Sequence, residues 1–424
     1  MSISLDIGLL SGKSVSVEAD MNEEVGALKR RAETALGVGR GQLVDSSGRV
    51  LDACAQIKRA RLQNGDSLVL HIGRAQIQAT PASFAAILGD GFVVALGDPG
   101  HGGDTSVVQH QLRNVQQIQA SYSAFAAILG DGSVVTWGDA DYGGDSCAVQ
   151  EQLKNVQQIQ DQLKNVQQIQ ATSNAFAAIL ADRSVVTWGA ADFGGDSTAV
   201  REVLKNVQQI QACQSAFAAI LGDGSVVTWG SACHGGDSSV VRDQLKNVQQ
   251  IQATCSAFAA ILADGTVVTW GHDLNGGDSS DVQDQLKNAQ QIQATNYAFA
   301  AILADCSVVT WGDACHGGDS SVVRDQLKNV QQIQASHSAF AAILDSRSVV
   351  TWGAADFGGD SSVVRDQLKN VQQIQASSSG FAFAAILDDG SVVSWGKERQ
   401  EEEDEEEEEE DGEEDEWRVC TARN

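Results

Sequence analysis

Seven residues that precede a repeated Gly-Gly-Asp are the side chains of this sequence best suited to chemistry. They share one repeat position, where imidazole, aromatic and amide groups alternate. Such a variable set predicts a surface that contacts a protein partner; the alternative is loop packing over the adjacent turn. Because histidine occupies only three of the seven positions, we do not expect a metal site. The residues are His101, Tyr142, Phe193, His234, Asn275, His316 and Phe357.

The aspartates of Gly-Gly-Asp form a second repeated set. Acid–base catalysis needs two carboxylates that converge, whereas Asp followed by Ser or Thr is typical of a turn or a helix cap. We therefore interpret these aspartates as turn or cap residues. The sequence contains no phosphate-binding loop, dinucleotide fingerprint or catalytic Cys/His arrangement. We expect no enzymatic activity and no cofactor. The aspartates are Asp104, Asp145, Asp196, Asp237, Asp278, Asp319 and Asp360.

The eight cysteines are dispersed and include no C-x-x-C pair. Within the repeat described below they replace small residues at mostly unrelated positions, which favours reduced thiols over disulfides or zinc. The N-terminus lacks the pattern of a signal peptide, and no run of about 18 apolar residues occurs. We expect a cytoplasmic protein, with the nucleus as the alternative, that does not enter a membrane.

The formal charge of −28 is unevenly distributed. Residues 1–73 are balanced, while residues 74–396 and 397–424 carry −16 and −12. Nucleic-acid binding requires basic side chains that neutralise phosphates. Direct binding to nucleic acid is therefore not expected.

A period of 41 residues organises most of the chain. The alanine that ends the word QIQA recurs with this spacing, except for one interval of 51. The longer interval contains a ten-residue duplication, DQLKNVQQIQ at 161–170. A fixed period of this size indicates a solenoid, array or propeller. The alanines are Ala79, Ala120, Ala171, Ala212, Ala253, Ala294, Ala335 and Ala376.

Each unit carries the pattern of a β-hairpin. The run FAAIL is apolar on both faces, as in a strand between two layers, and SVVTWG is rich in β-branched and aromatic residues. Asp-Gly separates the two runs in five of eight units, which predicts a turn with positive φ at both residues. QIQA supplies a third strand. For the connector, as in GGDSSVVRDQLKN, we favour a turn with one or two helical turns over a long helix.

Residues 166–196, VQQIQATSNAFAAILADRSVVTWGAADFGGD, resemble the propeller repeat of the regulator of chromosome condensation family. The short period is similar to the compact three-stranded blades of the propeller-type β-lactamase inhibitor. The resemblance covers 74–396 and departs where the family has Gly and His before the apolar strand; Thr172 and Ala175 mark that place here. It implies a closed ring of seven or eight short blades. The tryptophans at one position per unit would then pack between blades.

The first 73 residues predict two strands, a helix and further strands. Val25, Leu28, Ala32 and Leu36 lie on one helical stripe that Gly37 ends. This order, with Leu-x-Gly-Lys at residues 10–13, resembles ubiquitin. The resemblance maps a partner-binding patch to Leu10, Val44 and His71, the last of which is apolar in ubiquitin. The Gly-Gly end needed for conjugation is absent, which implies a built-in ubiquitin-like domain; a solubilising cap is the alternative.

The residues from 397 onward are dominated by acidic side chains, with 15 among residues 401–416. Like charges at this density keep a chain solvated and unfolded. We expect a disordered tail that aids solubility or tethers a basic partner.

The expected fold is mainly β: a ubiquitin-like β-grasp domain (1–73), a seven- to eight-bladed β-propeller (74–396) and an acidic tail (397–424). The function we expect is that of a non-enzymatic scaffold that links a protein on the propeller to ubiquitin receptors or the proteasome. One alternative is a small-GTPase regulator such as a nucleotide exchange factor, which is implied by the resemblance. Another is a non-catalytic component of a ubiquitin ligase.

Overall fold

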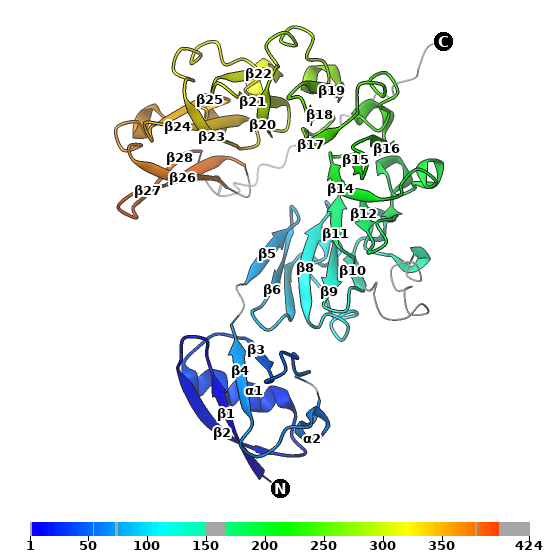
Figure 1. Ribbon diagram of the computed structural model, residues 1–424, viewed down its shortest axis with the longest axis vertical. Coiled ribbons are helices and arrows are strands. Elements are labelled where there is room, and N and C mark those ends of the chain that lie inside the picture. Colours follow the sequence, from blue (N-terminus) through cyan, green and yellow to red (C-terminus); the bar gives the residue numbers. More distant parts are fainter. Residues whose placement is uncertain (1, 54, 73–74, 150–165, 378–379, 398–424) are drawn as a thin grey trace, which may run out of the picture.

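The computed structural model describes residues 2–53, 55–72, 75–149, 166–377 and 380–397. Its N-terminal part is a four-stranded sheet packed on a helix (Figure 1). The strand order is β2-β1-β4-β3, with β1 parallel to β4 and the other pairs antiparallel. The elements are β1 (Ser2–Gly8), β2 (Ser14–Asp20), α1 (Val25–Leu36), β3 (Gln42–Val44), α2 (Ile57–Ala60) and β4 (Ser67–His71).

Helix α1 has the boundaries that its sequence predicts. Val25, Leu28, Ala32 and Leu36 are buried against the sheet, in a core with Leu5, Leu43 and Leu70 among others. Gly37 ends the helix with φ 66, a left-handed conformation that glycine adopts without steric cost. The expected order of strands and helix is therefore present in this part of the chain.

Eight three-stranded antiparallel sheets follow, which we call blades 1 to 8 in chain order. QIQA, FAAIL and VVTWG form the three strands, as expected. Blade 1 contains β5 (Gln76–Ala79), β6 (Ser83–Ile87) and β7 (Val93–Gly97); blade 2 contains β8 (Val115–Ala120), β9 (Ala124–Leu129) and β10 (Val134–Gly138); blade 3 contains β11 (Gln168–Ala171), β12 (Ala175–Ile179) and β13 (Val185–Gly189); blade 4 contains β14 (Val207–Ala212), β15 (Ala216–Leu221) and β16 (Val226–Gly230). Blade 5 contains β17 (Val248–Ala253), β18 (Ala257–Leu262) and β19 (Val267–Gly271); blade 6 contains β20 (Ala289–Ala294), β21 (Ala298–Leu303) and β22 (Val308–Gly312); blade 7 contains β23 (Val330–Ala335), β24 (Ala339–Leu344) and β25 (Val349–Gly353); blade 8 contains β26 (Val371–Ala376), β27 (Ala382–Leu387) and β28 (Val392–Gly396).

The hairpin turn differs from the one we expected. In blade 2 the Leu129 amide donates to the Ser133 carbonyl, and the Gly132 amide donates to the Leu129 carbonyl. Gly132 has φ 79, but Asp131 is not among the residues with positive φ. This is a type I turn followed by one left-handed residue, so the expectation of two positive φ angles is wrong. Asp131 instead accepts a hydrogen bond from the Ser133 amide.

The hydrophobic cores lie between blades rather than within them. On β18, Phe258 and Ala260 pack against the β15 strand of blade 4, while Ala257 and Ala259 pack against blade 6. The Trp270 ring stacks on Phe258 at 5.3 Å, and its indole Nε1 donates to the Gly235 carbonyl at 3.0 Å. The repeated tryptophan thus packs between blades, as its position predicts.

The described connectors are irregular segments with one or two 3-10 helices of three residues each, in agreement with the shorter alternative. The Gly-Gly-Asp aspartate closes a turn: Asp237 accepts from the Ser239 amide at 2.9 Å, and equivalent bonds occur in the other units. The 3-10 helices are η1 (Pro99–His101), η2 (Ala140–Tyr142), η3 (Cys147–Val149), η4 (Ala191–Phe193), η5 (Thr198–Val200), η6 (Ala232–His234), η7 (Asp273–Asn275), η8 (Ala314–His316), η9 (Ala355–Phe357) and η10 (Ser362–Val364).

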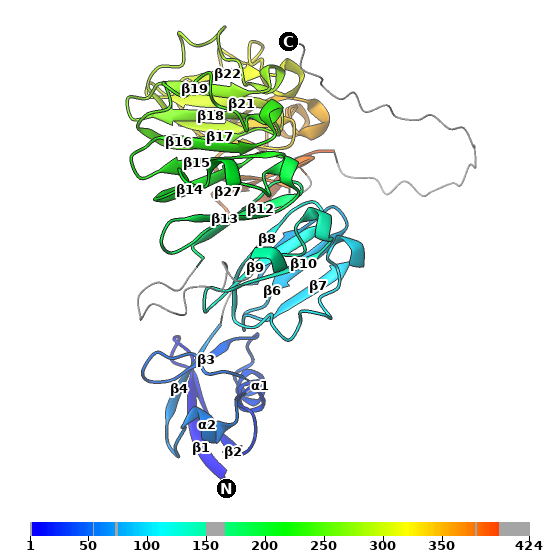
Figure 2. The ribbon, with the colours of Figure 1, turned by 90° about the vertical axis from the view of Figure 1, so that its right-hand side faces the viewer.

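The blades curve into an arc whose two ends do not meet (Figures 1 and 2). Seven apolar clusters join consecutive blades, and none of the described clusters joins blade 8 to blade 1. Phe84 of blade 1 is 57 % exposed, whereas its equivalent Phe125 in blade 2 is fully buried. The structure therefore has the eight blades we expected as one alternative, but not the closed ring.

Candidate protein-interaction surface

In each of the first seven units, two loops meet at one end of the blade. The first is the turn between the first and second strands, and the second is the 3-10 helix before Gly-Gly-Asp. In blade 2 the Ser121 hydroxyl, in the first loop, donates to the Tyr142 carbonyl, in the second, at 2.8 Å. Thr172 binds the Phe193 carbonyl in the same way at 3.0 Å. The repeated Ser or Thr therefore holds the residue before Gly-Gly-Asp against the strand turn.

The seven residues that the sequence singles out are all half-buried at this position. Four of them, His101, Tyr142, His316 and Phe357, make ring contacts with side chains of the strand turns. The other three differ in their surroundings. Phe193 packs against the core between blades 3 and 4. His234 Nδ1 hydrogen-bonds the Ser231 hydroxyl, and the Asn275 amide donates to the Ser256 hydroxyl at 2.6 Å.

Five rings form a continuous row across blades 6 to 8, which we call the aromatic row. Its order is His316, Tyr297, His337, Phe357 and Phe381. Successive ring centroids are 4.4, 5.6, 5.1 and 4.9 Å apart. These separations are those of favourable aromatic pairs. A smaller group of His101, Tyr122 and Tyr142 lies at blades 1 and 2.

Three members of the row come from the strand turn, a position that the sequence analysis missed. Tyr297, His337 and Phe381 stand between the invariant QIQA and FAAIL. The missed signal is in the alignment of the units. Four residues separate these words, or six in the last unit, and the second and third of them vary most, whereas the words hardly change. Variable residues on a constant frame are typical of binding surfaces in repeat proteins.

The frame beneath the variable turns is a chain of backbone hydrogen bonds between blades. The Asn296 amide donates to the His337 carbonyl at 2.9 Å, and the His337 amide donates to the Gly380 carbonyl at 3.2 Å. Equivalent bonds run from Tyr122 through blades 3, 4 and 5 to Asn296. Successive turns are thereby held at fixed spacing, which positions the side chains that they carry.

His337 is suited to an apolar contact. Burial lowers the pKa of its imidazole, and the nearby His316 lowers it further. Its Nδ1 lies 2.7 Å from the Ser338 hydroxyl. The ring is therefore largely uncharged at neutral pH, and it stacks on Phe357 without a buried charge.

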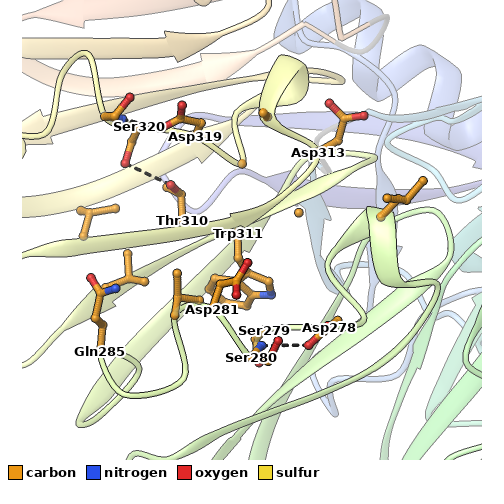
Figure 3. Close-up of a pocket in the computed structure, with 18 of the residues that line it drawn as sticks. Asp278, Ser279, Ser280, Asp281, Gln285, Thr310, Trp311, Asp313, Asp319 and Ser320 are labelled. Carbon is orange, nitrogen blue, oxygen red and sulfur yellow. Dashed lines mark hydrogen bonds between the residues drawn. The ribbon is translucent and has the colours of Figure 1, made fainter.

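Grooves between successive connectors provide a second set of candidate sites. The groove between blades 5 and 6 has a volume of about 680 Å³ and is lined by Asp278, Ser280, Trp311 and Asp319, among others (Figure 3). Hydrogen bonds to the amides of nearby serines lower the pKa of both aspartates, so they stay ionised and are unsuited to proton transfer. Within the described residues no three His, Cys, Asp or Glu side chains could hold a metal ion.

Buried Cys213 shows why the thiols of this chain are not all nucleophiles. Burial raises the pKa of its thiol to about 11. The Sγ contacts the His234 carbonyl at 3.2 Å, in the place that Ser or Thr takes in other units. A thiol with this pKa is almost wholly protonated at neutral pH and reacts poorly.

The three residues of the mapped patch lie in the β1–β2 turn and on the paired strands β3 and β4. Leu10 is 78 % exposed in the β1–β2 turn, and Val44 is half-buried on β3. The residue paired with Val44 is Val69, whereas His71 pairs with Gln42. His71 is two residue pairs from Val69, so Val44 and His71 lie on the same face of the β3–β4 pair.

The N-terminal sheet, together with its helix α1, also contacts blade 1, in part through a buried ion pair. Lys29 Nζ of α1 lies 2.9 Å from Asp90 Oδ2, and both side chains are less than 10 % exposed. Gln42 Nε2 donates to Asn114 Oδ1 at 3.1 Å in the same interface. Asp90 is the hairpin-turn aspartate of blade 1, so one copy of the repeated turn is used for docking. No charge pattern in the sequence distinguishes it from the other turns.

None of the helices among the described residues is long and apolar enough to cross a membrane. The sequence matches no protein-family model and no curated protein. Solved structures give partial likenesses. Prp20p from Saccharomyces cerevisiae, whose structure was described with its binding to Gsp1p and histones, is 14 % identical with TM-score 0.38, over 57 % of this chain and 72 % of that one.

Two further structures are similar over parts of the chain. The CRINKLY ectodomain of the Arabidopsis thaliana receptor kinase ACR4 is 16 % identical with TM-score 0.35, covering 67 % of this chain and 97 % of that one. A design based on ubiquitin is 18 % identical with TM-score 0.16, covering 16 % and 85 %. These scores are below 0.5, so the description of the fold rests on the strand pairing itself.

Proposed function

We propose that this chain is a non-enzymatic protein-binding scaffold and that the aromatic row is its main binding surface. The observation that carries the proposal is the five-ring row on a backbone frame that links blade to blade. Aromatic side chains bring large contact area at low entropic cost and are enriched where proteins bind one another. A rigid frame lowers the ordering cost of binding further.

The experiment is affinity purification with the full-length chain and quantitative comparison of the captured proteins. We expect the variant H337S/F381S to lose a specific set of partners by about tenfold or more, because hot-spot aromatics commonly contribute more than 1 kcal/mol each. The matched control is Val322→Ser, at a 93 % exposed connector position outside the row. Equal capture by the row variant and the control would contradict the proposal.

A finer part of the proposal is a link to ubiquitin receptors or the proteasome through the N-terminal sheet. It is supported by the β-grasp strand order and by exposed Leu10 beside the β1–β2 turn. In the same purification, Leu10→Asp should remove ubiquitin-pathway proteins while it leaves the partners of the aromatic row bound. Enrichment of small GTPases among the row-dependent partners would instead favour the GTPase-regulator alternative.

A further inference from the structure

The two ends of the blade array expose apolar surfaces that are buried everywhere else. On blade 1 the N-end face consists of Ile77, Phe84, Val94 and Leu96, which are 42–66 % exposed. On blade 8 the C-end face includes Ile386 and Val392, which are 39 % and 64 % exposed. Terminal units of soluble repeat arrays normally present a polar outer face. Within the part of the chain that the structure describes, no further blade covers either face.

The N-end and C-end faces have the composition of the two halves of an interior junction. Between blades 7 and 8, Ala339, Ala341 and Ile343 pack against Ile374, Phe383, Val393 and Trp395. The C-end face repeats the first half as Ala382, Ala384 and Ile386, and the N-end face repeats the second as Ile77, Phe84, Val94 and Leu96. The array therefore ends in two surfaces that fit each other by the same packing that joins its blades.

Leu96 is an independent sign that the N-end face fits the C-end face. Each interior tryptophan donates its indole N–H to a glycine carbonyl of the preceding connector, as Trp395 does to Gly358 at 3.0 Å. No Gly-Gly-Asp connector follows blade 8 in the sequence. A tryptophan in blade 1 would thus bury an N–H without this acceptor, at a cost of about 1–3 kcal/mol. Leu96 has the apolar bulk without the donor.

The N-end face and the C-end face of one chain do not meet, because the repeated geometry of the junctions holds blades 1 and 8 apart. Every junction from blade 2 to blade 8 has the same strand-turn backbone bond and the same tryptophan bond, so the step from blade to blade is repeated. With this step, blade 8 ends apart from blade 1, as the two views show (Figures 1 and 2). A head-to-tail contact that does not close within the chain propagates to another copy.

We propose that a second copy of this chain packs its N-end face on the C-end face, so that the protein associates head to tail. The N-terminal sheet does not obstruct this contact, because it docks on the hairpin turn at Asp90 and leaves Phe84 and Leu96 exposed. The contact adds one more junction with the same apolar packing and requires no change in the other seven.

The test uses full-length chains in sedimentation velocity from about 1 to 100 μM. The wild type should form oligomers that grow with concentration. The variants F84D/L96D and I386D/V392D should each be monomeric, since each keeps only one face. Mixed in equal amounts, they should form a one-to-one dimer and nothing larger, because their intact faces are complementary. The control Val240→Asp, at an exposed connector position, should behave as the wild type.

A wild type that stays monomeric at every concentration overturns the proposal, and so does a mixture of the two variants that fails to dimerise. Circular dichroism checks that each variant is folded. If an aspartate variant does not fold, the milder Phe84→Ser and Val392→Ser replace it. These should weaken self-association by at least about tenfold, as truncation of central interface residues commonly does.

Discussion

Interior and terminal blades have nearly the same sequence but very different surroundings. Phe258 of blade 5 is fully buried, whereas Phe84 of blade 1 is 57 % exposed. The hairpin forms in both, with the same strand pairing between its second and third strands. The comparison shows that local sequence determines the hairpin, while its hydrophobic core depends on the neighbouring blade. A unit of this kind is stable through its junctions.

The largest effect should come from removing the buried ring. Phe258→Ala should cost about 3–5 kcal/mol of local stability, because it leaves a cavity between blades 4 and 5. In the monomeric chain, at concentrations below self-association, Phe84→Ala should cost less than about 1 kcal/mol, since most of that ring is in water there. Hydrogen exchange of the strands in blades 5 and 1 measures both. Similar losses at the two sites would contradict the comparison.

An intermediate effect is expected at the first glycine of Gly-Gly-Asp. Gly235 and Gly390 both have positive φ, at 86° and 82°, so alanine is strained by about 1–2 kcal/mol at either. At Gly235 the new Cβ would also lie 2.6 Å from the Phe258 ring, while nothing lies within 4 Å at Gly390. Gly235→Ala should therefore destabilise by a further 1–3 kcal/mol or so. The denaturant midpoints of the two variants measure this difference. Equal shifts of the midpoint would show that the Phe258 ring moves aside at little cost.

The smallest effect should be the pH response of the aromatic row. The pKa of His337 is below its ordinary value of 6.5, so the folded state favours the neutral ring. Its contribution to stability is complete above pH 6.5 and is lost as the pH falls toward the lowered pKa. Between pH 7.5 and 5.5 the wild type should lose slightly more stability than His337→Asn, measured by urea unfolding. An identical slope in both would exclude His337 as the source.

The sequence predicts most of the repeat unit, because its information is local. The short apolar run FAAIL and the β-branched and aromatic residues of SVVTWG indicate the strands, and Asp237 with its equivalents indicates a turn. The turn type was wrong, because Asp-Gly also suits a type I turn with one left-handed residue. The half-buried position of His101 and its equivalents stays compatible with both the contact surface and loop packing.

Long-range features were not readable from the sequence. The contact of Lys29 with Asp90 joins helix α1 to the hairpin turn of blade 1, and nothing local in the sequence marks either residue. The open arc follows from the angle between blades, which depends on side-chain packing rather than on the period. Residues 398–424, and with them the acidic tail, lie outside the described structure, so its tethering of a basic partner stays a prediction. The same holds for residues 161–165 of the duplication.

The first glycine of each Gly-Gly-Asp makes room for a ring of the following blade, as Gly235 does for Phe258. Each unit thus provides the space that the phenylalanine of the next blade occupies, whatever the total number of units. Duplication or deletion of a segment of 41 residues therefore leaves matching junctions between all blades inside the array. The number of blades can accordingly change by whole units while every interior junction keeps the same packing.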